Sequence, residues 1–215
     1  MKSRPSVWAR MREDVETVRR RDPAAPNRLV IVLSYPGLHA VWNHRTENWL
    51  WRHHLRSLAR LLSQWSRAWT GVEIHPGATL GRRLFIDHGM GVVIGETAVV
   101  GDDVLMFNGI NLGGTTMSPG KRHPTIGDRV VIGTGAKVLG AIYVGDDARV
   151  GANAVVVKDV PCGATAVGIP AEIRVHPDYA DRHTAASAVD DGDSGVHPGD
   201  VDLDHEVREP AMYYI

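Results

Sequence analysis

The stretch Thr125-Ile-Gly-Asp-Arg-Val-Val-Ile-Gly-Thr-Gly-Ala-Lys-Val-Leu-Gly-Ala-Ile-Tyr-Val-Gly-Asp-Asp-Ala-Arg-Val150 decides the fold, because every sixth residue in it is aliphatic. These residues are Ile126, Ile132, Val138, Val144 and Val150. A period of six differs from the period of about 3.6 in a helix and about two in a strand. It is typical of a solenoid whose coils consist of short flat faces. We therefore expect three hexapeptides to close one triangular coil, with the aliphatic side chains pointing to its axis.

The six-residue period extends on both sides of this stretch. Downstream it reaches Val156, and upstream it lands on Ile74, Leu80, Ile86, Val92, Ala98, Val104 and Ile110. Glycine often follows the aliphatic residue, and we expect it to supply unusual backbone angles at the corners of the coil. The period fails between Asn111 and Thr125. We expect this segment to loop out of the coil and to carry functional residues.

The residues before the repeat predict helices, because their apolar side chains recur in steps of three and four. The first helix is expected around Val7–Val18 and ends before Asp22-Pro23. A second is expected from Arg28 to about His44, with a bend at Tyr35-Pro-Gly37, and a third from Glu47 to Trp69. All six tryptophans lie in this region, and we expect them to pack helices against one another or against a neighbouring subunit.

The composition divides the chain into three regions. We predict an α-helical bundle at 1–70, a parallel β-helix at 71–175 and an acidic tail at 176–215, which makes the fold α+β. The tail holds ten of the 25 acidic residues but only two of the 24 basic ones. It is expected to be flexible and solubilising. Its last residues, Ala211–Ile215, are apolar and aromatic, which is typical of an end that a partner captures.

Net charge and cysteine content indicate which cellular compartment and which binding partners to expect. The formal net charge is -1, so the whole chain has no general attraction to nucleic acid or to a membrane surface. No apolar run is long enough to span a bilayer, and no secretory signal is recognisable. Cys162 is the single cysteine, so an internal disulfide is impossible and a reducing compartment is favoured. We expect a cytoplasmic protein in which Cys162 is inert.

A set of motifs in fixed order resembles the serine acetyltransferases, which are hexapeptide-repeat acyltransferases. The resemblance runs from about Arg20 to Arg174 and is closest to the family's shorter members. The motifs are Arg21-Asp-Pro-Ala24, Tyr35-Pro-Gly-Leu-His-Ala40, Gly71-Val-Glu-Ile-His-Pro76, Ile86-Asp-His-Gly-Met-Gly-Val-Val-Ile-Gly-Glu-Thr97, Leu112-Gly-Gly-Thr115, Lys121-Arg-His-Pro124, Gly135-Ala-Lys-Val-Leu-Gly140 and Gly168-Ile-Pro-Ala171. The resemblance implies a left-handed coil, although parallel crossovers generally favour the opposite hand.

The resemblance also implies the reaction, which is acetyl transfer from acetyl-CoA to the hydroxyl of L-serine. It implies that His88 is the general base, since a histidine ring can take up the proton of a hydroxyl near neutral pH. Glu73 is then the carboxylate that orients the ring, at a position where some members carry aspartate. The two residues are 15 apart in sequence, close to one coil of about 18, so neighbouring coils can bring them together.

The remaining implied site residues bind the two substrates. Arg122 is expected to pair with the serine carboxylate, and His123 to orient the hydroxyl or assist the tetrahedral intermediate. Asp22 and Asp87 are expected at the ammonium group, with Asp22 acting on a neighbouring subunit's site. For CoA, the resemblance suggests Gly114, Gly135, Ala136 and Ala152 along the pantetheine arm, with Lys137 or Lys158 near the phosphates.

The resemblance further implies partners and regulation. It predicts a homotrimer with sites between subunits, leaves a dimer of trimers open, and makes L-cysteine a feedback inhibitor. A terminal isoleucine such as Ile215 enters the active site of O-acetylserine sulfhydrylase in this family, which places the reaction first in cysteine biosynthesis. No metal ion is needed, and Gly113-Gly-Thr115 lacks the strand and helix that a nucleotide-binding loop requires.

Three other functions compete with this hypothesis. The same fold can serve a different acyl acceptor, such as a sugar or an antibiotic. A β-helix zinc carbonic anhydrase would use His75, His88 and His123 as ligands. A scaffold without catalysis would use the solenoid and the tail only for docking.

Individual residues also have simpler explanations. His75 is expected to form a hydrogen bond within its own corner. Asp22 can serve the boundary between two helices, and Arg122 can be a solvated loop charge.

Overall fold

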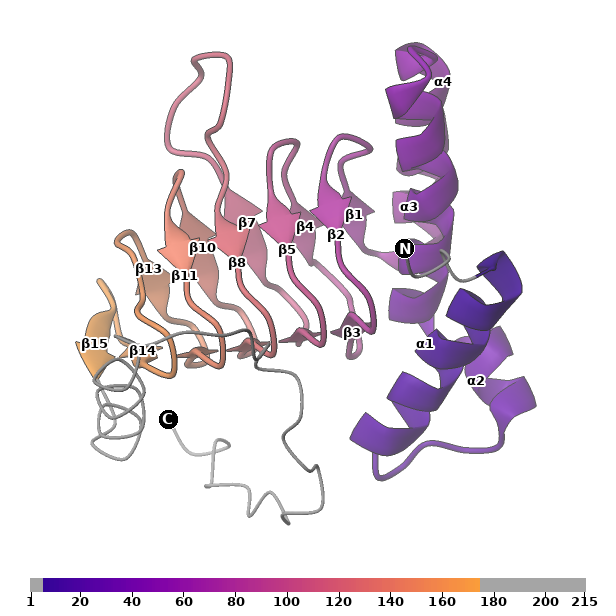
Figure 1. The fold of residues 1–215 in the computed structure, drawn as a ribbon, viewed down its shortest axis with the longest axis horizontal. Helices are drawn as coiled ribbons and strands as arrows, with labels where there is room; N and C mark the ends of the chain where they lie inside the picture. The colour runs from indigo at the N-terminus through magenta and orange to yellow at the C-terminus, as the bar shows by residue number, and fades with distance from the viewer. Residues whose placement is uncertain (1–5, 175–215) are drawn as a thin grey trace, which may run out of the picture.

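The computed structural model describes residues 6–174, so the predictions made for the tail and for Ile215 lie outside the described residues. The described chain begins with α1 (Val7–Arg21), α2 (Arg28–Ser34), α3 (Pro36–Arg52) and α4 (Arg56–Thr70). Fifteen short strands follow, and they wind into a prism with the helices at its N-terminal end (Figure 1). None of the described helices is both long and apolar enough to cross a membrane.

The ends of the first two helices follow the local sequence. Helix α1 begins at Ser6, whose hydroxyl accepts a hydrogen bond from the Ala9 N–H at 3.2 Å. Helix α2 begins in the same way at Asn27. The predicted bend at Tyr35-Pro-Gly37 is a break between α2 and α3, because Tyr35 is extended and Pro36 opens the next helix.

The predicted break between His44 and Glu47 is wrong. Helix α3 continues through this segment to Arg52, and the turn to α4 lies at residues 53–55. His54 adopts a left-handed backbone conformation there, with φ of 63°. Neither segment contains glycine or proline, so the local sequence carried no signal that separated the continuous helix from the turn.

The strands form three sheets that are the faces of the prism. The first sheet contains β1 (Glu73–Ile74), β4 (Val93–Ile94), β7 (Asn111–Gly113), β10 (Lys137–Leu139) and β13 (Val155–Val156). The second contains β2 (Thr79–Leu80), β5 (Val99–Val100), β8 (Thr125–Ile126) and β11 (Tyr143–Val144). The third contains β3 (Phe85–Ile86), β6 (Leu105–Met106), β9 (Val131–Ile132), β12 (Arg149–Val150), β14 (Thr165–Val167) and β15 (Glu172–Arg174).

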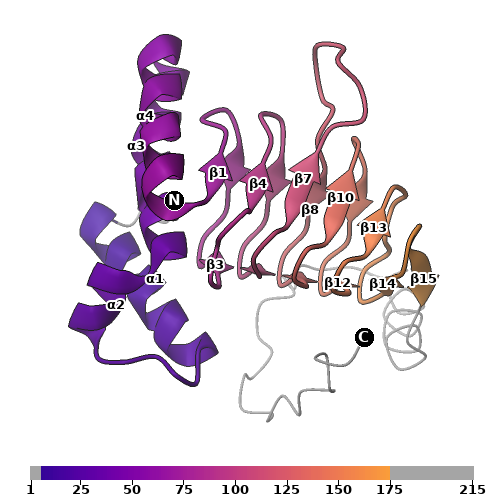
Figure 2. The ribbon, with the colours of Figure 1, turned by 180° about the vertical axis from the view of Figure 1, so that it is seen from behind.

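Successive strands from β1 to β14 belong to different sheets, and three of them complete one coil (Figure 2). All pairings are parallel except that of β14 with β15 at the C-terminal end. The predicted aliphatic positions are buried along the axis, apart from Leu80, which is half-buried. Their burial is the main stabilising contribution to this solenoid.

The period is interrupted at two places. Ile74 pairs with Ile94, so the first coil has 20 residues and the corner after β3, residues 87–92, holds two extra. After Ile86, a step of six therefore reaches Val92, which is buried but lies two positions before the inward strand residue Ile94. The same offset of two residues continues to Ile110, which precedes the strand residue Leu112. The second interruption is shorter than predicted, because Asn111–Gly113 stays in the first sheet with Leu112 fully buried. The loop that leaves the coil is 114–124.

The prediction that corner glycines supply unusual backbone angles is confirmed at some corners, where Gly109 and Gly135 have positive φ. At other corners the positive φ belongs to a residue with a side chain, such as Asp103. The glycines that directly follow the aliphatic residue are needed for a different reason, since a Cβ on Gly81 would lie 2.3 Å from the carbonyl oxygen of Gly101 in the next coil. The close stacking of coils therefore excludes a side chain at this position.

The helices are fixed to the first coils by apolar contacts and ion pairs. Val15, Val18, Ile31 and Leu38 form a small core with Phe85 of β3. Glu13 of α1 pairs with Arg82 at 2.8 Å and with Arg83 at 3.1 Å. The Arg21 guanidinium donates to the carbonyl oxygen of Asp103 at 2.7 Å. The N-terminal helices therefore hold a defined position beside β3.

Candidate active site

Two edges of the prism carry most of the predicted site residues. The first, which we call the His88 edge, joins the third sheet to the first at corners 87–92, 107–110, 133–136 and 151–154. The second, which we call the loop edge, joins the first sheet to the second at corners 75–78, 95–98 and 140–142 and at the loop 114–124. Both interruptions of the period therefore lie on these two edges.

The inserted corner of the His88 edge presents His88 to solvent. Its backbone is left-handed, with φ of 58° at His88, 74° at Gly89 and 76° at Gly91. Residues with side chains adopt this conformation at other corners of the coil too, for example at Asp103, so it shapes the corner without marking it as functional. The His88 side chain is 74% exposed, and its Nε2 lies 3.6 Å from Oδ2 of Asp87. The ring is thus accessible to a substrate that approaches from outside.

Tyr35 connects two of the predicted aspartates at this edge. Its hydroxyl donates to Oδ2 of Asp22 at 2.5 Å. Burial, this hydrogen bond and the charges of Asp22 and Asp87 together raise the pKa of Tyr35 to about 12. The phenol therefore stays protonated. Asp22 and Asp87 of one chain thus both act on Tyr35, and the expected action of Asp22 on a neighbouring subunit's site stays a prediction.

Asp22 also has the structural role that was considered for it. Its Oδ1 accepts a hydrogen bond from the Ala24 N–H at 2.8 Å, directly after the end of α1. Both carboxylate oxygens are thus engaged within the chain. The role of Asp22 in binding substrate stays a prediction.

Glu73 pairs with a different residue from the one predicted. Its carboxylate lies 3.3 Å from Nε of Arg67 in α4. The described structure has no contact between Glu73 and the His88 ring. Glu73 does lie next to Val93, in the strand that follows the His88 corner. The orientation of His88 by Glu73 therefore stays a prediction.

Thr97 holds His123 at the loop edge. The Thr97 N–H lies 3.2 Å from Nδ1 of His123, and its hydroxyl lies 2.9 Å from the same nitrogen. The hydroxyl oxygen also accepts hydrogen bonds from the N–H groups of Arg122 and His123. Since an N–H can only donate, Nδ1 is the acceptor and the ring proton is on Nε2. His123 is only 9% exposed, so its ring is fixed as an N–H donor.

The pKa of His123 is lowered, chiefly by burial and also by the positive charge of Arg122. The neutral form is therefore favoured. Gly95 makes this position possible, because a Cβ there would lie 2.0 Å from Cδ2 of His123. The Lys121 ammonium donates to the Thr97 carbonyl at 2.8 Å and closes the loop over this corner.

Arg122 is paired and is not a freely solvated loop charge. Its guanidinium lies 2.5 Å from Oε2 of Glu96. This hydrogen bond is the main reason why the pKa of Glu96 is lowered. Arg122 keeps further N–H donors that can receive a second carboxylate.

His75 has the local role that was expected. Its Nδ1 accepts a hydrogen bond from the Gly77 N–H at 3.0 Å, within the same corner. Its ring packs against the Trp51 ring in an edge-to-face arrangement, with a distance of 4.9 Å between the ring centroids. Burial is the largest cause that lowers the pKa of His75 to about 4. The three histidines of the zinc alternative are divided between the two edges, and the described residues contain no cluster suited to a metal ion.

The residues predicted for CoA also lie on both edges. Gly135, Ala136 and Ala152 lie on the His88 edge, whereas Gly114 and Lys158 lie on the loop edge. Ala136 is fully buried, so the described chain exposes no part of it to a ligand. The Lys137 ammonium donates to the carbonyl oxygens of Gly109, at 3.0 Å, and Gly135. Lys158 is exposed and is the better placed of the two lysines for a phosphate.

The structure does not bring the two edges together within one chain. They are the opposite borders of the first sheet, and a face of six residues spans about 20 Å at most. Asp22, Asp87 and His88 lie at one border of this sheet, and Arg122 and His123 lie at the other.

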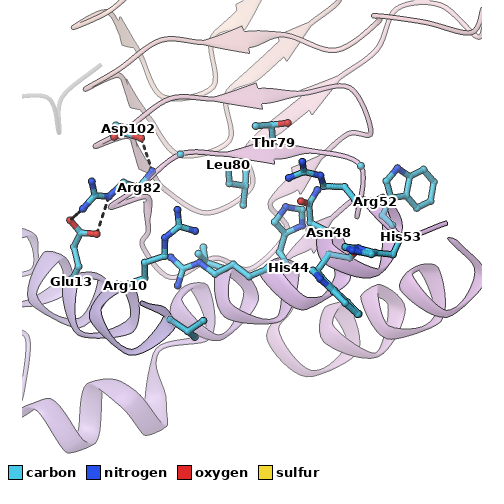
Figure 3. A pocket seen from close by; sticks show the side chains of 17 residues that line it. Arg10, Glu13, His44, Asn48, Arg52, His53, Thr79, Leu80, Arg82 and Asp102 are labelled. Carbon is cyan, nitrogen blue, oxygen red and sulfur yellow. Dashed lines mark hydrogen bonds and ion pairs between the residues drawn. The ribbon is translucent and has the colours of Figure 1, made fainter. Parts of the chain in front are cut away.

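A large groove lies elsewhere, between α1, α3 and β2 (Figure 3). Its volume is about 1260 Å³, and its lining includes Arg10, Arg52 and Arg82. Arg82 is held at its rim by Glu13 and by Oδ1 of Asp102, which accepts from the Arg82 N–H at 2.7 Å. None of the predicted site residues lines this groove, so it is separate from the predicted serine site.

Sequence reasoning missed three residues that organise the site. They are Tyr35, Glu96 and Thr97, which hold Asp22, Arg122 and His123. All three belong to motifs that carried the resemblance. Their roles depend on contacts over 13 to 26 residues of sequence, which no local pattern displays.

The chain is similar in sequence to proteins of a known family. A family model described as bacterial transferase hexapeptide (six repeats) matches residues 123–158. A serine acetyltransferase of Mycobacterium tuberculosis is 59% identical over 163 residues, which cover 76% of this chain and 71% of that protein.

The fold of the chain is also similar to solved structures. A Neisseria gonorrhoeae serine acetyltransferase in complex with serine has a TM-score of 0.73 at 41% identity, covering 76% of this chain and 67% of that one. A serine acetyltransferase in complex with cysteine has a TM-score of 0.76 at 41% identity, covering 79% of this chain and 66% of that one. The chain thus spans about two thirds of these solved chains. Together with the repeats, they identify the solenoid as the left-handed β-helix that was predicted.

Proposed function

The chain belongs to the serine acetyltransferase family, and from this premise we propose that it transfers the acetyl group of acetyl-CoA to the hydroxyl of L-serine. The products are O-acetyl-L-serine and CoA. The observation that carries this proposal is the position of His88, exposed on a left-handed corner beside Asp87. A base for a hydroxyl must be accessible and held in place, and this corner meets both conditions.

In this reaction the serine hydroxyl attacks the thioester carbonyl while His88 accepts its proton. The tetrahedral intermediate then expels the CoA thiolate, which takes the proton from the imidazolium. Glu73 or Asp87 stabilises the imidazolium that forms. The Nε2–H of His123 is a neutral donor fixed by Thr97, which suits the developing oxyanion. This route requires no metal ion.

Serine is recognised through its charged groups. Arg122, held by Glu96, receives the serine carboxylate through its free N–H groups. Asp87 and Asp22 receive the ammonium group at the His88 edge, where Tyr35 orients Asp22. L-cysteine differs from L-serine only in carrying sulfur in place of the hydroxyl oxygen. It therefore fits the same subsite and acts as a feedback inhibitor.

The division of the site between two edges supports a homotrimer, in which each His88 edge meets the loop edge of the next subunit. Acetyl-CoA then lies between subunits, with its pantetheine arm near Gly114 and Gly135 and its phosphates near Lys158. We assign the enzyme to the cytoplasm. Its reaction is then the first step of cysteine biosynthesis. Ile215 is the residue that O-acetylserine sulfhydrylase would capture.

The test is thiol release from acetyl-CoA with L-serine as acceptor, compared between the wild-type protein and His88→Ala. General base catalysis contributes about 10²- to 10⁴-fold, so the variant should lose activity by that factor. CoA binding should be retained, because His88 belongs to the serine side of the site. If folded protein that binds CoA released no thiol with serine, the acceptor assignment would be wrong, and a screen of amines and alcohols would follow.

A further inference from the structure

The large groove between α1, α3 and β2 has no part in the proposed reaction, yet it holds two buried polar atoms without partners. Four buried side-chain atoms of the described residues make no hydrogen bond. Two of them, Oε1 of Glu16 and Nη1 of Arg45, are in ion pairs. The other two, Nδ1 of His44 and Nε of Arg10, have no ion pair among the described residues, and both residues line the groove. Native proteins rarely bury such atoms, so their gathering in one groove requires an explanation.

His44 offers a hydrogen-bond acceptor in this groove. Its side chain is only 3% exposed, and its Nε2 lies 3.2 Å from the carbonyl oxygen of Ala78. Because a carbonyl can only accept, the ring proton is on Nε2, and Nδ1 carries a lone pair. Burial lowers the pKa of His44 to about 4, so the ring is neutral near pH 7. The lone pair of Nδ1 is therefore available to a hydroxyl or N–H group of a ligand.

The arginines of the groove are not equally neutralised. Arg45 and Arg82 each pair with an acidic residue, at 2.7 Å and 2.8 Å. Both acidic residues of the lining already accept a hydrogen bond from Arg82. Arg10 and Arg52 have no ion pair with any residue that the structure describes. The lining therefore keeps two positive charges that no carboxylate of the described chain compensates.

These charges come from two different helices. In Figure 3 the side chains of Arg10, from α1, and Arg52, from α3, enter the groove, and the His44 ring lies between them in this view. A phosphate monoester carries about 1.5–2 negative charges near pH 7, which matches two guanidinium groups. Guanidinium groups also bind phosphate oxygens through paired hydrogen bonds. The groove therefore favours a phosphate ester over a singly charged anion.

The size and the aromatic lining of the groove suit an organic ligand. Its volume of about 1260 Å³ is ample for a small organic molecule. Trp49 also lines it and is 55% exposed. The Trp49 ring packs against the His53 ring, with 4.3 Å between the ring centroids. A tryptophan held in this way offers a flat surface on which a sugar or a base can lie.

We propose that this groove binds an organic phosphate that carries hydroxyl groups, such as a sugar phosphate or a nucleoside monophosphate. Arg10 and Arg52 bind the phosphate oxygens, and Nδ1 of His44 accepts a hydrogen bond from a hydroxyl. One ligand of this class satisfies both unpartnered atoms and both uncompensated charges. The groove is separate from the predicted serine site, so this ligand is neither the acetyl donor nor the acceptor.

The test is isothermal titration calorimetry of the full-length protein with AMP, ribose 5-phosphate and inorganic phosphate. At least one organic phosphate should bind, at least about tenfold more tightly than inorganic phosphate, because only the organic probes extend beyond the phosphate group. Arg10→Gln and Arg52→Gln should each raise its Kd at least about tenfold. Arg12→Gln is the matched control, because Arg12 is exposed on the same helix as Arg10 and lies outside the lining. Circular dichroism should show that all variants are folded.

A measurement on the wild-type protein tests His44 without changing a buried residue. The nitrogen NMR signal of Nδ1 of His44 should shift on addition of the organic phosphate, since a lone pair becomes a hydrogen-bonded acceptor. Trp49→Ala separates the two sources of the phosphate. If AMP binds more tightly than ribose 5-phosphate and loses that advantage in Trp49→Ala, the ligand is a nucleoside phosphate. Equal affinities would identify a sugar phosphate.

Four outcomes would overturn the proposal. A groove that holds only water would bind neither organic probe. Binding that Arg10→Gln and Arg52→Gln leave unchanged would lie elsewhere, and loss of binding in Lys158→Gln instead would place the probe at the predicted CoA site. Inorganic phosphate that binds as tightly as both organic probes would show an anion site without recognition of hydroxyl groups. The titration contains neither serine nor acetyl-CoA, so its result is independent of the proposed reaction.

Discussion

The two interruptions of the hexapeptide period hold their histidines in opposite ways. His88, in the two-residue insertion, is 74% exposed and has one carboxylate 3.6 Å away. His123, at the end of the longer loop, is 9% exposed, and Thr97 binds its Nδ1 with both the N–H and the hydroxyl. The first ring is free to approach a substrate, and the second is fixed before any substrate arrives.

This difference corresponds to two different tasks. A general base must reach the proton of a substrate and change its own protonation state during the reaction. A donor to an oxyanion works best when its orientation and charge are set in advance. The two groups lie on opposite borders of one sheet. In the homotrimer that we propose, one subunit supplies His88 and the next subunit supplies His123 to the same serine.

The largest effect is expected when the two halves are damaged in different chains. At a serine concentration below the wild-type KM, His88→Ala and Arg122→Ala should each have little activity as pure proteins. When the two variants are co-expressed and mix within a trimer, about a quarter of the interfaces combine an intact His88 with an intact Arg122. Thiol release should then recover to about a quarter of the wild-type rate. A control in which both changes are in every chain should stay inactive, and a mixture without recovery would show that each site lies within one chain.

Much of the fold could be predicted because the aliphatic ladder repeats at a fixed interval. The positions from Ile126 to Val156 are buried as expected, since their side chains have no other place within a narrow coil. The two-residue insertion at 87–92 escaped detection because Val92, six residues after Ile86, is aliphatic and buried, as is the strand residue Ile94. The turn at His54 escaped because nothing in its local sequence requires a left-handed residue.

The site could be predicted as a set of residues but not as a geometry. His88, Arg122 and His123 follow from motifs that are contiguous in sequence. Glu73 illustrates the limit, because its side chain contacts Arg67 of α4 rather than the histidine one coil away. Whether a carboxylate reaches one neighbour or another depends on packing between a helix and a coil. No spacing along the chain contains that information.

The next effect concerns substrate binding by the loop. Arg122→Ala removes a charge-assisted pair with the serine carboxylate, and such pairs contribute about 1.5–3 kcal/mol. The KM for serine should therefore rise about 10- to 100-fold, with a smaller change in kcat. Arg122→Lys keeps the charge but loses the forked geometry, so its KM for serine should lie between those of the wild type and Arg122→Ala. Arg129→Ala, an exposed pair with Asp147, is the control. A variant with unchanged KM would remove Arg122 from the serine subsite.

A smaller effect on the KM for serine should show whether Glu96 positions Arg122 or competes with the serine carboxylate for it. Glu96→Gln keeps the shape of the side chain that holds Arg122 but removes its negative charge. If Glu96 fixes the guanidinium for serine, the KM should rise about three- to tenfold while kcat hardly changes. A fall in KM would instead mean that Glu96 competes with the serine carboxylate. Glu172→Gln on the exposed strand β15 serves as the control.

The smallest effect is a pH dependence that belongs to the fixed histidine. The pKa of His123 lies below its ordinary value of 6.5, because burial and the charge of Arg122 disfavour the imidazolium. Just below pH 6.5 the unfolded chain therefore binds more protons than the folded one. The contribution of His123 to loop stability is present above pH 6.5 and is lost as the pH falls through the folded pKa. Ring signals of His123 in an NMR titration should show this low pKa, and amide exchange in residues 114–124 should accelerate on acidification. A His123 ring that titrates at or above 6.5 would mean that Thr97 does not hold it as a neutral donor, and the contrast with the exposed His88 would then be lost.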